Sequence, residues 1–224
     1  MPEQQLLDDE EIRRRVLDEL EFDPAIEEPT HIGVAADNGV VTLTGTVSSY
    51  PAKFAAERAA RRVLGVRAVA NDIEVKLPFE RTRTDTDIAT AAVNALEWDT
   101  VVPSDRIKVT VRDGFVTLEG NVDWYYQKEA AERDVRNLQG VRGVANLITV
   151  AAPKVSPEEV KAKIAQALER SAELDARKIK VEAYDGRLVL SGTVRSWAER
   201  QEAEAVAWAT RGVSQVENRI IVSP

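Results

Sequence analysis

The sequence contains no cysteine and a single histidine among its 224 residues. Without cysteine, the chain cannot form disulfide bonds, thiolate nucleophiles or zinc sites that need thiolate ligands. A single histidine, His31, rules out a multi-histidine metal site within one chain. We expect His31 at the surface or in a loop. The sequence therefore has few of the side chains on which catalysis usually depends.

Long apolar runs and catalytic motifs are also missing. No run approaches the ~18 apolar residues of a membrane-spanning helix. Residues 1–15 have neither the basic region nor the apolar region of a secretory signal. No phosphate-binding loop, nucleophile elbow, HExxH motif or calcium-loop spacing is present. We expect a soluble, cytoplasmic, non-enzymatic protein with no cofactor, no metal site and no transmembrane segment.

Positive charge is in deficit, since the formal net charge is −8. Phosphate binding relies on clustered lysine and arginine, so we expect no nucleic-acid partner. The deficit is uneven along the chain. Residues 8–78 hold 14 acids and 9 bases, residues 84–153 hold 11 and 7, and residues 156–224 hold 11 of each. The last third is therefore the least repulsive to an anionic surface.

What the sequence does have is a threefold internal repeat. Three glycines and one asparagine recur with spacings of 6, 20 and 6 residues, as Gly39, Gly45, Gly65 and Asn71, then Gly114, Gly120, Gly140 and Asn146, then Gly186, Gly192, Gly212 and Asn218. These matches predict three modules of about 70 residues, a size that is small but viable for a folded unit. We place them at 8–78, 84–153 and 156–224.

Each module shows the same succession of hydrophobic periods. A helical face comes first, at Ile12, Val16, Leu17 and Leu20, at Ile88, Ala92, Val93 and Leu96, and at Val160, Ile164, Ala165 and Leu168. An alternating strand, a two-residue turn such as Asn38-Gly39 and a second strand ending near Gly45 follow. A second helix, lined by small residues and ending at Gly65, leads to a third strand. The fold class is α+β, with three tandem α-β-β-α-β modules, each a three-stranded mixed sheet with both helices on one face.

The repeated string resembles a known domain. Each module follows the pattern G-x-V-x-L-x-G-x-V, then a helix with A-x-x-x-A, each in full or with one conservative change, and then reads G-V-x-x-V-x-N-x-I-x-V. This pattern is similar to the BON domain, named after bacterial osmotically induced and nodulation proteins. The resemblance implies a non-enzymatic module, often exported, that is associated with phospholipid surfaces, envelope integrity or osmotic stress. It makes a periplasmic location the alternative to the cytoplasm.

Acidic residues cluster at Asp8, Asp9, Glu10 and Glu11, where the first helix is expected to begin. Carboxylates at a helix start interact favourably with the helix dipole and the free backbone N–H groups. We therefore interpret this cluster as helix capping rather than as a metal or catalytic site.

One candidate contact surface is aromatic. Tyr50, Tyr125 and Trp197 occupy the same repeat position at the start of the second helix, and Trp124 and Tyr126 extend it in the middle module. Amphipathic aromatic side chains at a helix end suit a membrane interface or a protein contact. A contact between modules, or a local staple of the helix start, explains the same position, and both readings stay open here.

The second candidate surface is the sheet face without helices. The third module places Val189 and Ile221 there, where the first has Thr42 and Glu74 and the second has Thr117 and Thr149. An uncovered sheet face should be polar, so this one is expected to dock on another module, a second copy or a partner. Basic residues flank it, namely Lys178, Lys180 and Arg187.

The sequence supports two functional hypotheses. The first is a binding or scaffolding protein of the stress response that contacts an anionic phospholipid surface or a protein partner. The second is a structural protein whose modules pack together or form a homo-oligomer. A small ligand or a cation held by backbone carbonyls stays open, because such sites need no signature side chains.

Overall fold

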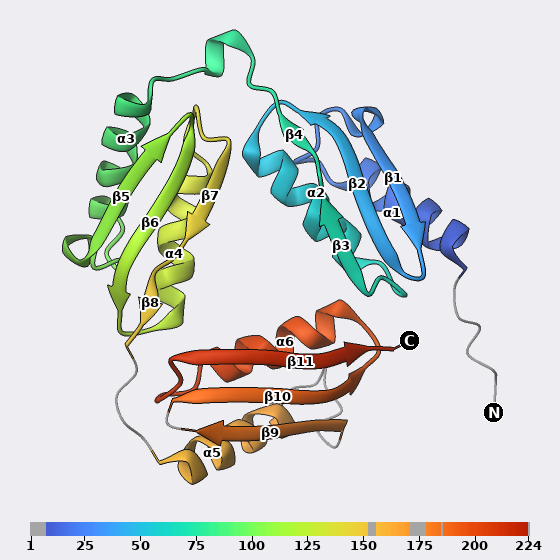
Figure 1. Cartoon of the computed structure of the whole chain (residues 1–224), viewed down its shortest axis with the longest axis vertical. Helices are drawn as coiled ribbons and strands as arrows, with labels where there is room; N and C mark the ends of the chain where they lie inside the picture. Colours follow the sequence, from blue (N-terminus) through green and yellow to red (C-terminus); the bar gives the residue numbers. More distant parts are fainter. Residues whose placement is uncertain (1–7, 152–155, 171–177, 185, 224) are drawn as a thin grey trace.

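The computed structural model describes residues 8–151, 156–170, 178–184 and 186–223 (Figure 1). Within these ranges the chain forms six helices and three separate mixed sheets, one sheet per repeat. Each sheet has its own buried core. The predicted class of three tandem α-β-β-α-β modules is confirmed.

Module 1 follows the expected order of elements. Its elements are α1 (Asp9–Phe22), β1 (Ile32–Asp37), β2 (Val40–Val47), α2 (Tyr50–Arg62), β3 (Ala68–Asn71) and β4 (Glu74–Val75). The lone histidine lies in a short 3-10 helix (Pro29–His31), where its exposed ring pairs with Glu28 at 2.9 Å. A second 3-10 helix (Phe79–Arg81) lies between modules 1 and 2.

Modules 2 and 3 repeat this order. Module 2 consists of α3 (Asp85–Trp98), a 3-10 helix (Ser104–Arg106), β5 (Ile107–Arg112), β6 (Phe115–Val122), α4 (Tyr125–Arg136), β7 (Gly143–Asn146) and β8 (Thr149–Val150). Module 3 consists of α5 (Pro157–Arg170), β9 (Ile179–Tyr184), β10 (Arg187–Val194), α6 (Trp197–Trp208) and β11 (Gln215–Val222). The third strand is continuous in module 3, whereas in the other two modules it is divided into two short strands.

The second strand is the centre of every sheet. It pairs antiparallel with the first strand across the hairpin and parallel with the third strand after the crossover helix. In module 1, Val34 lies opposite Leu43 on β2, and Val41 on β2 lies opposite Val69. The buried residues of α1 and α2 belong to the same core as those of the sheet, so both helices cover one face.

The first helix of each module buries a narrower face than the sequence pattern suggested. Ile12, Val16 and Leu20 are buried, as are their counterparts in the other modules. The fourth predicted position is not part of the core, because Val93 and Ala165 are exposed. The core contact therefore follows the i, i+4, i+8 row alone.

The repeated glycine inside the second strand is required by a close backbone approach. A Cβ atom at Gly45 would lie 2.0 Å from the carbonyl oxygen of His31, and its φ of 113° disfavours other residues. Gly120 and Gly192 have the same geometry. The expectation that β2 ends at this glycine was wrong, because the strand continues to Val47.

The second helix packs closely on the sheet through small residues, as predicted. Ala56 and Ala60 of α2 are completely buried, and so are Ala131, Ala203 and Ala207. The predicted helix ends were wrong, because α2 ends at Arg62 and Gly65 follows in a separate turn with a φ of 91°. The glycine conformation was right, but it serves the turn that leads into β3.

The repeated asparagine ties the third strand to the second helix. The Asn71 side-chain amide donates to the carbonyl oxygen of Lys53 at 3.2 Å and to the Glu57 carboxylate at 3.2 Å. Its side-chain oxygen accepts from the backbone N–H of Ile73. Asn146 and Asn218 form the same three bonds. One side chain thus fixes the strand, the loop and the helix together.

The three modules stand around a common centre (Figure 1). The helices α2, α4 and α6 lie on the inner side of this arrangement, and the first strands β1, β5 and β9 lie towards its outer rim. Contacts connect all three neighbouring pairs of modules, including α2 of module 1 with α6 of module 3. The chain therefore closes into a ring.

Candidate functional site

The junction between modules 1 and 2 is built on the first turn of α2. Tyr50 packs against the core of module 2, and burial raises the pKa of its hydroxyl, partly offset by a backbone hydrogen bond from Val144. Phe54, one turn later, receives the guanidinium of Arg136 at 3.9 Å from its ring centroid. Phe54 of module 1 therefore meets the last turn of α4, and Tyr50 reaches β7.

The junction between modules 2 and 3 has the same construction with different residues. The ring of Tyr125, in the first turn of α4, stacks on Trp208 in the last turn of α6, with centroids 4.2 Å apart and planes 9° apart. Burial, together with the charges of Glu129, Glu204 and Glu132, raises the pKa of Tyr125 to about 12. This hydroxyl stays protonated under physiological conditions.

The junction between modules 3 and 1 closes the ring. Trp197, in the first turn of α6, packs against the core of module 1. The guanidinium carbon of Arg61, in the last turn of α2, lies 5.2 Å from the centroid of this indole. Arg200 of module 3 itself lies over the same ring at 4.6 Å. Each module therefore extends one aromatic side chain to the next module in a cycle.

The repeated aromatic position thus lies at the contacts between modules. The two neighbours that extended it behave differently. Trp124 is the partly buried residue that precedes α4, and Tyr126 points outward with 53% of its surface exposed. Of the five aromatic candidates, Tyr126 is the most accessible to a partner outside the chain.

The outer sheet face of module 3 is less apolar than its sequence implied. Val189 is only 8% exposed and lies in register between Glu182 on β9 and Glu217 on β11. Glu217 accepts hydrogen bonds from Arg187 and Arg219 on the same face. Ionic side chains therefore surround Val189 within its own sheet.

The other candidates of this face are distributed around it. Ile221 is 59% exposed and lines a cleft between modules 3 and 1. Lys180 is exposed on β9, and Lys178 immediately precedes this strand. The structure brings Arg187 and Val189 together on β10 and leaves Lys180 on β9 and Lys178 just before β9.

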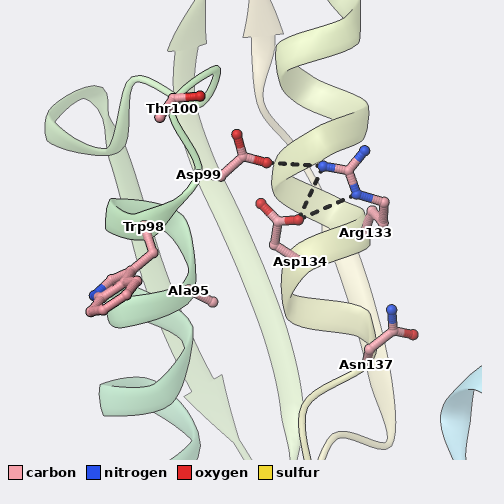
Figure 2. A pocket seen from close by; sticks show the side chains of 7 residues that line it. All are labelled: Ala95, Trp98, Asp99, Thr100, Arg133, Asp134 and Asn137. Atoms are coloured by element: carbon pink, nitrogen blue, oxygen red, sulfur yellow. Dashed lines mark hydrogen bonds and ion pairs between the residues drawn. The ribbon is translucent and has the colours of Figure 1, made fainter.

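A second surface cleft, of about 600 Å³, lies in module 2 between the end of α3 and α4 (Figure 2). Arg133 binds two carboxylates there, Asp99 at 2.9 Å and Asp134 at 3.2 Å. The remaining oxygen of Asp134 is buried with no hydrogen-bond donor in the described residues. Burial and the nearby charge of Asp99 raise the pKa of Asp134.

The corresponding place in module 1 is neutralised differently. Asp23, the counterpart of Asp99, lies 3.5 Å from both Arg58 and Arg62. Ala59 occupies the position of Asp134. Burial opposes ionisation of Asp23, but a backbone hydrogen bond from Ala25 and the two arginines lower its pKa overall. The paired carboxylates are therefore particular to module 2.

The described residues contain no group of three or more histidine, cysteine, aspartate or glutamate side chains that could hold a metal ion. Within the acidic cluster, Asp8 caps α1 as expected by accepting from the N–H of Glu11 at 2.7 Å, whereas Asp9 accepts from backbone N–H groups of the β1–β2 turn. In the described ranges, no helix is both long enough and apolar enough to cross a bilayer.

Sequence reasoning missed several exposed aromatic side chains, and two of them occupy equivalent positions in their modules. Phe22 is 83% exposed and Trp98 is 87% exposed, and each is the last residue of the first helix in its module. Figure 2 shows the Trp98 ring pointing away from the Asp99–Arg133 cluster. Each lies two residues after the last core residue of its helix, Leu20 or Leu96, and this shared position could have revealed them in the sequence.

Comparison with known proteins gives the chain its family. The BON domain matches residues 8–76, 84–152 and 156–224. The chain is 35% identical over 121 residues to osmotically-inducible protein Y of Escherichia coli, covering 52% of this chain and 60% of that protein. It therefore spans less than two thirds of that relative.

Two further relatives share similar identity. The 21 kDa hemolysin of Actinobacillus pleuropneumoniae is 31% identical, with 63% of this chain and 74% of that protein covered. The outer membrane lipoprotein DolP of Haemophilus influenzae is 30% identical, with 62% of this chain and 72% of that protein covered. Since the family pattern spans nearly the whole sequence in three copies, the chain belongs to the BON domain family.

Proposed function

We propose that this chain is a non-enzymatic binding and scaffolding protein of the bacterial osmotic-stress or envelope-stress response. Its relatives include an osmotically-inducible protein and an outer membrane lipoprotein. These names support an envelope location, the periplasmic alternative, over the cytoplasmic expectation. The ring supports a scaffolding role, because it fixes three modules relative to one another through aromatic contacts.

The single observation that carries the proposal is the exposure of Trp98 at the outer end of α3. An indole that is 87% exposed gains nothing from the fold and loses favourable burial. Tryptophan at the end of a helix is suited to a phospholipid interface or to a pocket on a protein. We therefore propose that Trp98, assisted by Phe22 at the equivalent place in module 1, makes the external contact.

A vesicle experiment tests this contact. The full chain is centrifuged with vesicles of anionic or zwitterionic phospholipid at low and at physiological salt. Trp98→Ala is expected to reduce the bound fraction severalfold, because tryptophan contributes most to interfacial binding. Tyr126→Ala, which removes another exposed aromatic side chain of module 2, serves as the matched control and should bind as the wild type does.

The outer sheet face of module 3 is the second proposed contact. This module carries no net charge, and its exposed residues include Lys180, Tyr184 and Ile221. If lysine at this face attracts anionic lipid, Lys180→Glu weakens binding at low salt, and salt removes the difference. Lys108→Glu changes the same repeat position in module 2 and should have little effect.

A protein partner is the alternative to the phospholipid surface. If neither vesicle composition binds the chain at either salt, the lipid version fails. The variants are then compared in a strain that lacks the gene, by growth after an osmotic upshift. Loss of complementation by Trp98→Ala, with complementation retained by Tyr126→Ala, supports a protein contact. Full complementation by both variants would contradict the proposed role of this surface.

A further inference from the structure

A cleft of about 370 Å³ lies where module 3 meets module 1. Module 1 contributes the hairpin turn and the start of β3, and module 3 contributes the first turn of α6 and the end of β11. Its lining residues are Asn38, Val40, Arg67, Ala68, Trp197, Arg200, Ile220, Ile221 and Val222. The volume lies at the lower end of the range for small-molecule sites.

The charge of this cleft is opposite to that of the chain. Two of its lining residues, Arg67 and Arg200, are cationic and none is acidic, although the chain carries a net charge of −8. Arg200 is held in place, because its guanidinium donates to the carbonyl oxygens of Asn218 at 2.8 Å and Ile220 at 3.1 Å. Arg61, which also contacts the Trp197 ring, is paired with Glu57 and adds no free charge to the cleft.

Several donors at this junction lack an acceptor. Across the described ranges, the Arg67 guanidinium has no hydrogen bond or ion pair, while its methylene groups lie close to Gly39. The Trp197 indole N–H and the Nε of Arg61 are buried without an acceptor among the described residues. The Arg67 guanidinium is exposed and can bind an anion that enters the cleft, whereas the two buried donors lie out of reach of such a ligand.

The other junctions carry different side chains at the equivalent positions. At the position of Val40, module 2 has the larger Phe115, whose ring lies over Gly143, the counterpart of Ala68. Module 3 has Arg187 at this position, where it is paired with Glu217. The small side chains Val40 and Ala68 are therefore particular to the junction between modules 3 and 1.

We infer that this cleft binds a small organic anion with an apolar body, such as a medium-length carboxylate. The anionic group would be bound by the exposed guanidinium of Arg67, near the positive charge of Arg200, and the apolar body would lie against Trp197, Val40 and Ile221. Because the walls come from the first and the last module, the ligand also stabilises ring closure. The inference is independent of the external contact of Trp98.

Octanoate is the probe for this site. Titration calorimetry on the full chain should show saturable binding at one site, with a dissociation constant on the order of 1 mM for a ligand of this size. Octanol and octylammonium have the same chain without the negative charge. Each should bind roughly tenfold more weakly or not saturably, because the charge-assisted bonds are lost.

Two variants and one control assign the site. Arg67→Gln should raise the dissociation constant roughly tenfold, and Ala68→Glu should abolish binding by placing a carboxylate in the cleft. Both residues are exposed, so the fold should be retained. Arg142→Gln alters the equivalent arginine of module 2 and should leave binding unchanged.

The inference has clear contrary outcomes. Absence of saturable octanoate binding overturns it, as does equal binding of octanol. Equal loss with Arg67→Gln and Arg142→Gln would show that the general charge of the chain, rather than this cleft, attracts the probe. Saturating octanoate should also raise the melting temperature of the wild type and leave that of Ala68→Glu unchanged.

Discussion

Modules 1 and 2 hold their hairpin turns with a carboxylate that module 3 does not have. Asp9 accepts from the backbone N–H of Asn38 at 2.8 Å and of Gly39 at 3.0 Å. Asp85 binds the amides of Asp113 and Gly114 in the same way, each at 2.9 Å. The counterpart in module 3, in the first turn of α5, is Pro157.

This difference separates the residues that determine the fold from those that reinforce it. Module 3 keeps the strand pairing, the glycines and the asparagine of the other two modules. The turn carboxylate is therefore not needed to reach the fold. It contributes stability to modules 1 and 2 by holding two amides of the turn, which a proline side chain cannot do.

The largest effect is expected where the two kinds of module meet. Trp208→Ala removes the stack with Tyr125 and opens the junction between modules 2 and 3. We expect a loss of about 3 kcal/mol in the free energy of unfolding, measured by chemical denaturation. Tyr126→Ala should cost less than about 0.5 kcal/mol, because this neighbour is exposed. Similar losses for the two variants would contradict the junction as a stabilising contact.

The turn carboxylate should have an intermediate effect. Asp85→Ala is expected to cost about 1 kcal/mol and to accelerate amide hydrogen exchange at Asp113 and Gly114. In module 1, these backbone bonds lower the pKa of Asp9. The contribution of Asp9 to the free energy of unfolding is therefore complete above the ordinary aspartate pKa. It is lost as the pH falls through the lowered pKa that Asp9 has in the folded chain.

The converse substitution tests the comparison directly. Pro157→Asp gives module 3 the carboxylate of the other modules and should slow amide exchange in the peptide that begins β10. Pro157→Ala removes the proline without adding an acceptor and is the control. If both variants slow exchange equally, the proline itself rather than the missing carboxylate explains the difference between the modules.

The smallest expected effect concerns the paired carboxylates of module 2. Burial and Asp99 raise the folded pKa of Asp134, so its contribution is present below the ordinary aspartate pKa and is lost as the pH rises through the folded value. Asp134→Ala places alanine at this position, as in module 1. Relative to the wild type, its free energy of unfolding should increase by about 0.5 kcal/mol as the pH is raised from 4 to 7. A constant difference across this range, in denaturation at several pH values, would contradict the cause assigned to the shift.

The fold could be predicted from the sequence because its signals are local and repeated. Glycine at Gly39 and Gly45 reports backbone conformations that other residues disfavour, and alternation around Val34 reports a half-buried strand. The resemblance to the BON domain further indicated that these signals belong to one domain. The exact ends of helices and strands were less certain, since they depend on turns such as the one at Gly65.

The candidate site was harder to predict because its contacts join distant residues. Tyr125 and Trp208 are adjacent only after two modules have folded and met. The sequence identified the position of Tyr125 and allowed a contact between modules, but nothing local named its partner. The bonds of Asp9 to a turn 29 and 30 residues away were missed for the same reason.

The cyclic order of the junctions limits how many modules the chain can combine. Each interface is head-to-tail, pairing the start of one second helix with the end of the next, and such interfaces either close or continue indefinitely. Here the rotation between neighbouring modules closes the ring after three modules. A version shortened to two modules would expose the aromatic start of one second helix and the uncovered end of the other. These two surfaces are complementary, so such a version would be prone to associate end to end with other copies.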